Sequence, residues 1–206
     1  MKVRLSQRTG QCMQNINIQK GETLMKKTVL LAGLALLFSA TVVAAEEFTL
    51  KSDQIGGQLT IEQVYNSFGC TGKNISPSLK WSGAPKSAKS FALTVYDPDA
   101  PTGSGWWHWV VFNIPVDVTE LKTDAGNPQK GIAPKGSVQS MTDYGKPGFG
   151  GACPPPGDKP HRYIFTLYAL DVPKLDLDEK AGPPLVGFML NQHAIAKAAL
   201  ISYYGR

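Results

Sequence analysis

Two carboxylates lie close together in the segment Asp97-Pro98-Asp99-Ala100-Pro101. The segment follows an apolar run of strand-forming residues, so we expect both carboxylates at a strand end, where the prolines restrict the backbone. A carboxylate there could orient an imidazole or accept a hydrogen bond from an ammonium group of a ligand. An ordinary turn, in which an Asp side chain bonds nearby backbone N–H groups, is the alternative, and the segment alone leaves both open.

A histidine among tryptophans follows in the segment Trp106-Trp107-His108-Trp109-Val110-Val111. A strand alternates its side chains between two faces. On that rule one face carries Trp106, His108 and Val110, and the other carries Trp107, Trp109 and Val111. Trp106 would form a wall that tolerates a cation, and His108 could donate to an anion. A core histidine bonded to a backbone carbonyl is the alternative.

A loop rich in glycine and proline spans residues 150–157 and leads into His161-Arg162-Tyr163. Such a loop can present backbone N–H groups to an anion, beside a second imidazole. A hydrolase using His108, His161 and Asp97 is an alternative function. That reading lacks a nucleophile, because no GxSxG motif occurs and Ser104 lies in a turn-like Gly-Ser-Gly. We therefore expect a protein that is not an enzyme, with no catalytic residues.

Metal and cofactor sites have weak support. The same three side chains match the ligand count of a catalytic zinc site, but no HxH or HExxH spacing occurs. We expect neither a metal nor a cofactor. His193 lies in a predicted helix, where a core or surface role is expected.

The chain opens with a segment typical of export. Residues 25–45 begin Met-Lys-Lys, continue with a short apolar run and end in Val-Ala-Ala. This is the pattern of a cleavable signal peptide, with a cut expected after Ala45, or alternatively after Ala44. A membrane anchor is the alternative, although the run is shorter than the roughly 20 residues of a span. The predicted location is the periplasm, with residues 1–24 as an over-extended N-terminus before a true start at Met25.

The charge balance argues against a nucleic-acid partner. The whole chain carries +5, but six of its 21 basic residues and one of its 16 acidic residues lie in residues 1–45. The remainder, residues 46–206, is therefore neutral, which excludes a broad basic footprint. The mature chain also shows no amphipathic membrane-binding segment and no integral membrane segment.

The cysteines of an exported chain usually pair. Cys12 lies in the leader, and Cys70 and Cys153 remain in the mature chain. We predict a disulfide between these two, which would stabilise the fold by about 4–5 kcal/mol on a chain-entropy model. A redox or metal-binding pair is the alternative, but no CxxC spacing supports it.

Short strands dominate the rest of the chain. Proline and glycine supply 33 of the 161 residues after Ala45, a composition that favours strands joined by turns. The predicted strands are Phe48–Lys51, Gln58–Ile61, Ser78–Trp81, Ser90–Tyr96, Trp107–Ile114, Arg162–Leu170 and Leu200–Tyr204. Residues 117–121 and 127–136 are predicted loops, and Pro183 and Pro184 would open a helix over Leu185–Ala199. Residues 46–206 should form one mainly β domain.

Taken in order, these motifs resemble the phosphatidylethanolamine-binding protein family, also called Raf kinase inhibitor-like. Asp-Pro-Asp-Ala-Pro, Trp-x-His and a Gly/Pro loop before His-Arg-Tyr carry the resemblance, and residues 74–81 and 103–111 resemble its bacterial branch. It covers the chain from about Phe48 to the end. It implies a β-sandwich with a large antiparallel sheet and short C-terminal helices.

The resemblance also implies a pocket at one end of the sandwich that accepts phosphate, acetate or phosphorylated head groups. The ligand-binding positions it implies are Asp97, Asp99, Trp106, His108, Cys153, Pro155, His161 and Tyr163. Asp99 could instead brace its loop, and Cys153 stands where eukaryotic members have glycine. The expected partner is a phosphorylated small molecule or head group. A protein-interaction or kinase- or protease-inhibitor-type regulator without a small ligand is the alternative.

Overall fold

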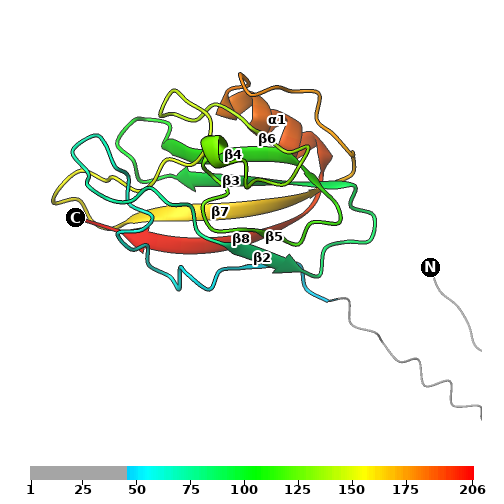
Figure 1. The fold of residues 1–206 in the computed structure, drawn as a ribbon, viewed down its shortest axis with the longest axis horizontal. Coiled ribbons are helices and arrows are strands. Elements are labelled where there is room, and N and C mark those ends of the chain that lie inside the picture. Colours follow the sequence, from blue (N-terminus) through cyan, green and yellow to red (C-terminus); the bar gives the residue numbers. More distant parts are fainter. Residues whose placement is uncertain (1–45) are drawn as a thin grey trace, which may run out of the picture. The chain divides into compact units, whose positions relative to one another are not determined.

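Two antiparallel sheets form the domain in the computed structural model, which describes residues 46–206. The predicted signal peptide, the segment before it and Cys12 lie outside the described residues. The smaller sheet has the order β1 (Thr49–Lys51), β2 (Leu79–Ser82) and β5 (Glu120–Leu121). The larger sheet has the order β6 (Val138–Gln139), β4 (Trp106–Pro115), β3 (Ser90–Asp97), β7 (His161–Leu170) and β8 (Ala194–Tyr204). Figure 1 shows its long strands side by side.

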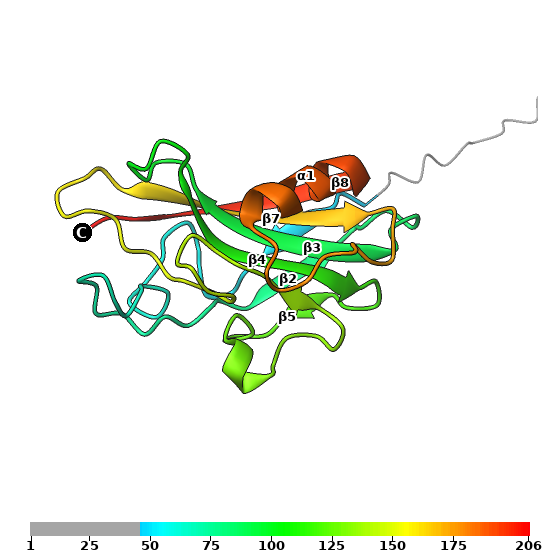
Figure 2. The same cartoon turned by 90° about the horizontal axis from the view of Figure 1, so that it is seen from above.

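The larger sheet buries both of its faces. Toward the smaller sheet, Leu93, Trp109 and Phe165 pack with Leu79 and Trp81 of β2 into the main core. On the opposite face, a second core forms beneath helix α1 (Pro183–His193). Figure 2 shows α1 on one side of the sheet and β2 and β5 on the other. The mainly β sandwich predicted from the sequence is confirmed.

The strict alternation predicted for β4 is wrong. Tyr96 pairs with Trp107 and Val95 pairs with Trp109, so His108 has no partner across the ladder. Such a bulge turns two consecutive side chains to the same side. His108 and Trp109 therefore both face the main core, whereas Trp107 and Val110 face the α1 side.

The predicted helix over Leu185–Ala199 is also wrong in its second half. The helix α1 ends at His193, and residues from Ala194 onward form strand β8, which pairs with β7 along its whole length. Without β8, the N–H and C=O groups along one side of β7 would be unpaired. The need to pair that edge outweighs the helical preference of the alanines in residues 194–199.

Smaller differences concern segments outside the long strands. The predicted strand Gln58–Ile61 is reduced to a single bridge between Gln58 and Tyr203. The predicted loop at residues 117–121 contains β5, and the loop at residues 127–136 contains one short 3-10 helix, Pro128–Lys130. Within residues 46–206, no helix combines the length and the apolar character that crossing a membrane requires.

Candidate ligand-binding pocket

A cavity of about 170 Å³ opens where β3 ends and β4 and β7 begin. The strand register brings these ends together, because Asp97 pairs with Trp106 and Tyr96 pairs with Ile164. The cavity is lined by Phe68, Asp97, Ala100, Pro101, Thr102, Trp106, His108, Tyr144, Cys153, Pro154, Pro155, His161 and Tyr163. Seven of the eight predicted ligand-binding residues are in this set, and Asp99 is not.

The Asp97 side chain both closes a turn and orients an imidazole, the two roles that the sequence left open. Its Oδ1 accepts hydrogen bonds from the backbone N–H groups of Asp99 (2.8 Å) and Ala100 (3.2 Å), which closes the turn after β3. Its Oδ2 accepts a hydrogen bond from Nδ1 of His161 at 2.8 Å. Since both carboxylate oxygens are engaged, Asp97 positions the turn and the imidazole together.

The imidazole of His161 is held between two carboxylates. Its Nδ1 faces Asp97, and its Nε2 lies 3.4 Å from Oδ2 of Asp158. Of the two carboxylates, that of Asp97 is buried and that of Asp158 is partly exposed. With both nitrogens facing acceptors, His161 has less donor capacity left for a ligand than the sequence alone indicated.

The second pocket imidazole, His108, has one nitrogen engaged and one without a partner. Its Nδ1 donates to the carbonyl oxygen of Gly150 at 2.8 Å, because a carbonyl can only accept. Its Nε2 is buried and has no hydrogen-bond partner. Burial lowers the pKa of His108, an effect opposed by the Gly150 carbonyl and the Asp97 carboxylate. The neutral ring therefore presents an Nε2 lone pair to the cavity.

Two further polar atoms in the pocket lining lack partners. The indole Nε1 of Trp106 and the hydroxyl of Tyr163 are buried without a hydrogen bond. Burial raises the pKa of the Tyr163 phenol, so the hydroxyl keeps its proton as a donor. A buried polar group without a partner costs about 1–3 kcal/mol, so a polar partner in the cavity would stabilise these three atoms.

Asp99 stabilises the rim without lining the cavity. Its carboxylate accepts hydrogen bonds from the backbone N–H, Nε and Nη2 of Arg162, each at 2.9 Å. The hydrogen bonds from Arg162 lower the pKa of Asp99 to about 2. The structure thus places Asp99 in the bracing role that the sequence analysis left open.

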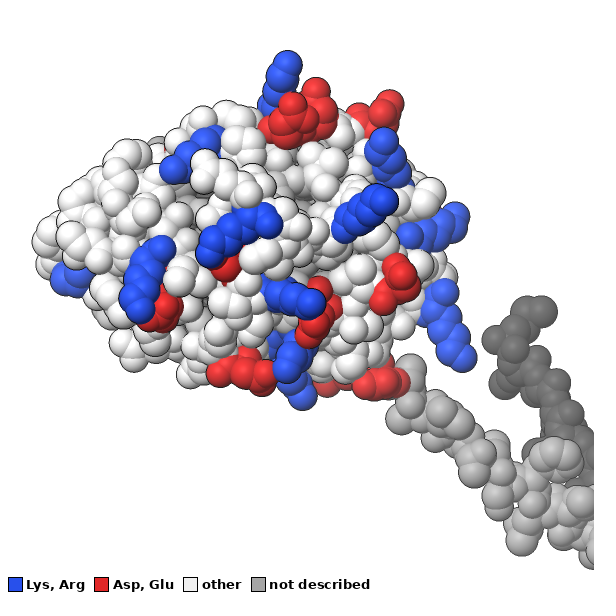
Figure 3. All heavy atoms as spheres, in the orientation of Figure 1, with Lys and Arg blue, Asp and Glu red and all other residues white. Residues whose placement is uncertain are grey.

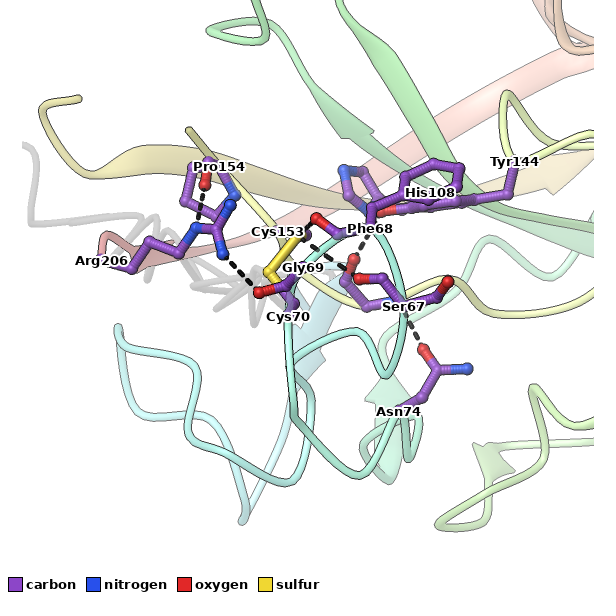
Figure 4. Close-up of a disulfide and its surroundings, with 11 residues drawn as sticks. Ser67, Phe68, Gly69, Cys70, Asn74, His108, Tyr144, Cys153, Pro154 and Arg206 are labelled. Atoms are coloured by element: carbon purple, nitrogen blue, oxygen red, sulfur yellow. Dashed lines mark hydrogen bonds between the residues drawn. A yellow bond between two sulfur atoms is a disulfide. The ribbon is translucent and has the colours of Figure 1, made fainter. Parts of the chain in front are cut away.

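Cys70 and Cys153 form a disulfide, as predicted (Figure 4). Through Cys153, this disulfide forms part of the cavity wall. It joins the loop carrying Phe68 to the loop carrying Pro154. The guanidinium of Arg206 ties the same two loops, donating to the carbonyl oxygens of Gly69 (2.9 Å) and Pro154 (2.6 Å). The two loops are therefore held together by both a disulfide and side-chain hydrogen bonds.

Sequence reasoning missed two aromatic residues of the pocket. The ring of Tyr144 lies 5.6 Å from that of His108, and its hydroxyl donates to the carbonyl oxygen of Gly151 at 2.7 Å. Phe68 adopts a positive φ of 57° and contacts the ring of Tyr65 edge-on and the ring of Tyr144 at a tilt. Their loops carry no recognisable motif; the only available signal was an aromatic residue beside glycine in a loop.

The pocket lining has little positive charge. It contains Asp97 and the two histidines, but no Lys or Arg. On the face visible in Figure 3, basic and acidic side chains are interspersed. Among residues 46–206, no group of three His, Cys, Asp or Glu side chains is arranged to hold a metal ion.

The chain is similar to proteins of one family. The model of the family described as phosphatidylethanolamine-binding protein matches residues 51–205. The UPF0098 protein YbcL of Escherichia coli (strain K12) is 50% identical over 180 residues, covering 87% of this chain and 98% of that protein. The UPF0098 protein YbhB of the same organism is 47% identical, covering 72% of this chain and 93% of that protein.

Solved structures agree. The crystal structure of E. coli YbcL, described as a new member of the mammalian PEBP family, matches with a TM-score of 0.76 and 54% identity, covering 78% of this chain and 99% of that chain. A putative phosphatidylethanolamine-binding protein homologue from Chlamydia trachomatis matches with a TM-score of 0.64 and 32% identity, covering 77% and 97% of the two chains.

Proposed function

Because this chain belongs to the phosphatidylethanolamine-binding protein family, we propose that its pocket binds phosphate or a phosphorylated head group without transforming it. The supporting observation is the set of three buried polar atoms without partners: Trp106 Nε1, His108 Nε2 and Tyr163 Oη. Two of these are donors, as the oxygens of an anion require. A ligand oxygen would accept hydrogen bonds from Trp106 Nε1 and Tyr163 Oη, two donors that otherwise lose hydration without compensation.

The size and walls of the cavity favour a head group over a whole lipid. About 170 Å³ is below the range of roughly 300–1,000 Å³ usual for drug-sized ligands. The rings of Phe68, Trp106 and Tyr144 are part of the lining, with Tyr144 in contact with the other two, and aromatic faces attract an ammonium group. A phosphate joined to an amine, as in phosphoethanolamine, would use both the donors and the aromatic wall.

The proposed function includes no hydrolysis of the bound ligand. Asp97 orients His161 as it would orient a general base, but Nε2 of His161 faces the Asp158 carboxylate in place of a nucleophile. No Ser, Cys thiol or Lys lines the cavity, since Cys153 is in the disulfide. Thr102 lines it, but its hydroxyl donates to the Gly105 carbonyl. Incubation with phosphoethanolamine should release no inorganic phosphate; protein-dependent release would favour the hydrolase reading.

Calorimetric titration with phosphoethanolamine, phosphate and ethanolamine tests binding. Tyr163→Phe removes one donor to a charged ligand, worth about 1.5–3 kcal/mol, so phosphoethanolamine should bind about 10- to 150-fold more weakly. Tyr168→Phe, a tyrosine on the α1 side of the same strand, is the matched control and should bind normally. If the wild-type protein binds none of the three compounds, the regulator without a small ligand becomes the better reading.

A further inference from the structure

We propose that the pocket binds its anion together with one proton, which is held between His108 Nε2 and the ligand. This inference rests on the proposed function and concerns how the charge of the ligand is compensated. A phosphorylated ligand that is dianionic in solution would take up one proton as it binds. The site would then favour ligands in their monoanionic form.

The geometry of His108 carries the argument. The Gly150 carbonyl occupies Nδ1 and fixes the proton of the neutral ring there. The bulge in β4 turns the ring into the cavity, where Nε2 is buried without a partner. A fully deprotonated phosphate oxygen facing this lone pair would place two acceptors against each other. One proton between them turns that repulsion into a charge-assisted hydrogen bond.

The charges around the pocket lead to the same conclusion. The ionisable side chains near His108 are Asp97 from β3, Tyr163 and His161 from β7, and Asp143 and Tyr144 from the segment after β6. Neither a Lys nor an Arg is among the lining residues to balance a dianion. The Trp106 and Tyr163 donors are neutral, so a proton is the available source of positive charge.

The free protein does not hold this proton in advance. Burial of the ring lowers the pKa of His108, and this is the largest influence on it. At about pH 8, where a phosphomonoester with a second pKa near 6 is dianionic, the proton must come from solvent. Because the complex then holds one more proton than the free protein and free ligand, the binding affinity falls about tenfold for each unit by which the pH rises in that range. At about pH 5 the ligand brings the proton itself, and uptake should be small.

Calorimetry of phosphoethanolamine binding in buffers of different ionisation enthalpy counts the protons directly. At about pH 8 the wild-type protein should take up close to one proton per ligand. His108→Gln keeps an amide donor that does not titrate, so its uptake should be near zero and its affinity should change little with pH. His193→Gln, which removes a histidine paired with Asp171 outside the pocket, should retain the wild-type uptake.

Ring ¹⁵N spectra of the wild-type protein provide a measurement that does not depend on a variant. His108 Nε2 should be unprotonated in the free protein and protonated in the complex. Binding without proton uptake, uptake that persists in His108→Gln, or an Nε2 still unprotonated in the complex would overturn this inference and leave the proposed function intact. Failure of the wild-type protein to bind would overturn both.

Discussion

Asp97 and Asp99 are two residues apart and have the same side chain, yet they have different surroundings. Asp97 is buried at the pocket and orients His161, whereas Asp99 forms a two-pronged ion pair with Arg162 at the rim. The strand register decides this, because it places β7 beside the end of β3. The two carboxylates therefore predict two different mutant phenotypes.

Asp99→Asn should destabilise the fold without abolishing ligand binding. Because the folded pKa of Asp99 is about 2 and an unfolded Asp titrates near 3.9, the ionised carboxylate stabilises the fold above about pH 4. That contribution is lost as the pH falls from about 4 through about 2. Thermal unfolding should show the variant clearly below the wild type at neutral pH, with the difference closing at low pH.

Asp53→Asn is the control for that experiment. Asp53 also forms an ion pair, with Lys80 at 2.7 Å, but both side chains are more than half exposed. Exposed pairs contribute little, so this variant should unfold close to the wild type. An Asp99→Asn protein as stable as the wild type at neutral pH would contradict the bracing role.

At the scale of elements, the pocket is made by loops that the two sheets hold in place. The ends of β3, β4 and β7 supply one side, and the two loops joined by the disulfide supply the other. Those loops contain little regular structure, so the disulfide and the hydrogen bonds from Arg206 replace the backbone ladders that fix strands. Stability and pocket shape are consequently coupled at the Cys70–Cys153 bridge.

Reduction of this bridge should lower the thermal midpoint by several degrees. The bridge spans a sequence separation of 83 residues, and opening it restores entropy to the unfolded chain, with about 4–5 kcal/mol as the upper value of the effect. Scanning calorimetry with and without a phosphine reductant measures the difference. A double variant, Cys70→Ser with Cys153→Ser, should show a lowered midpoint that no longer responds to reductant. An unchanged midpoint under confirmed reduction would contradict this.

At the scale of the whole molecule, the net positive charge lies in the segment that contains the predicted export signal. The net charge of +5 comes from residues 1–45, and residues 46–206 contain equal numbers of basic and acidic residues. We propose that the first 45 residues are removed during export and that the neutral domain works in the periplasm. The disulfide fits that compartment, because paired cysteines persist in oxidising environments.

Mass spectrometry of the protein isolated from a bacterial periplasmic fraction tests export. Cleavage after Ala45 should give a chain that begins at Glu46 and is lighter than the 22.2 kDa full-length chain. Replacement of Ala45 by a bulky residue should block cleavage, since small residues are required before the cut. An intact leader on the periplasmic protein would contradict the proposal.

Sequence by itself determined the features that depend on local chemistry or on ordered motifs. The long strands β3, β4 and β7 could be read from runs of β-branched and aromatic residues, and the opening of α1 from Pro183. The pairing of Cys70 with Cys153 also followed, because residues 46–206 contain only these two cysteines. The motifs located seven of the eight expected positions around the cavity.

Only the tertiary structure decided the features that depend on neighbours distant in sequence. Ala194–Ala199 became strand because β7 needed a partner, and His108 turned into the pocket because β4 bulges against β3. Phe68 and Tyr144 joined the site through loops whose positions the disulfide and the sheet ends impose. Residue type fixes what a group can do, but which nitrogen of His108 is left without a partner depends on where the Gly150 carbonyl lies.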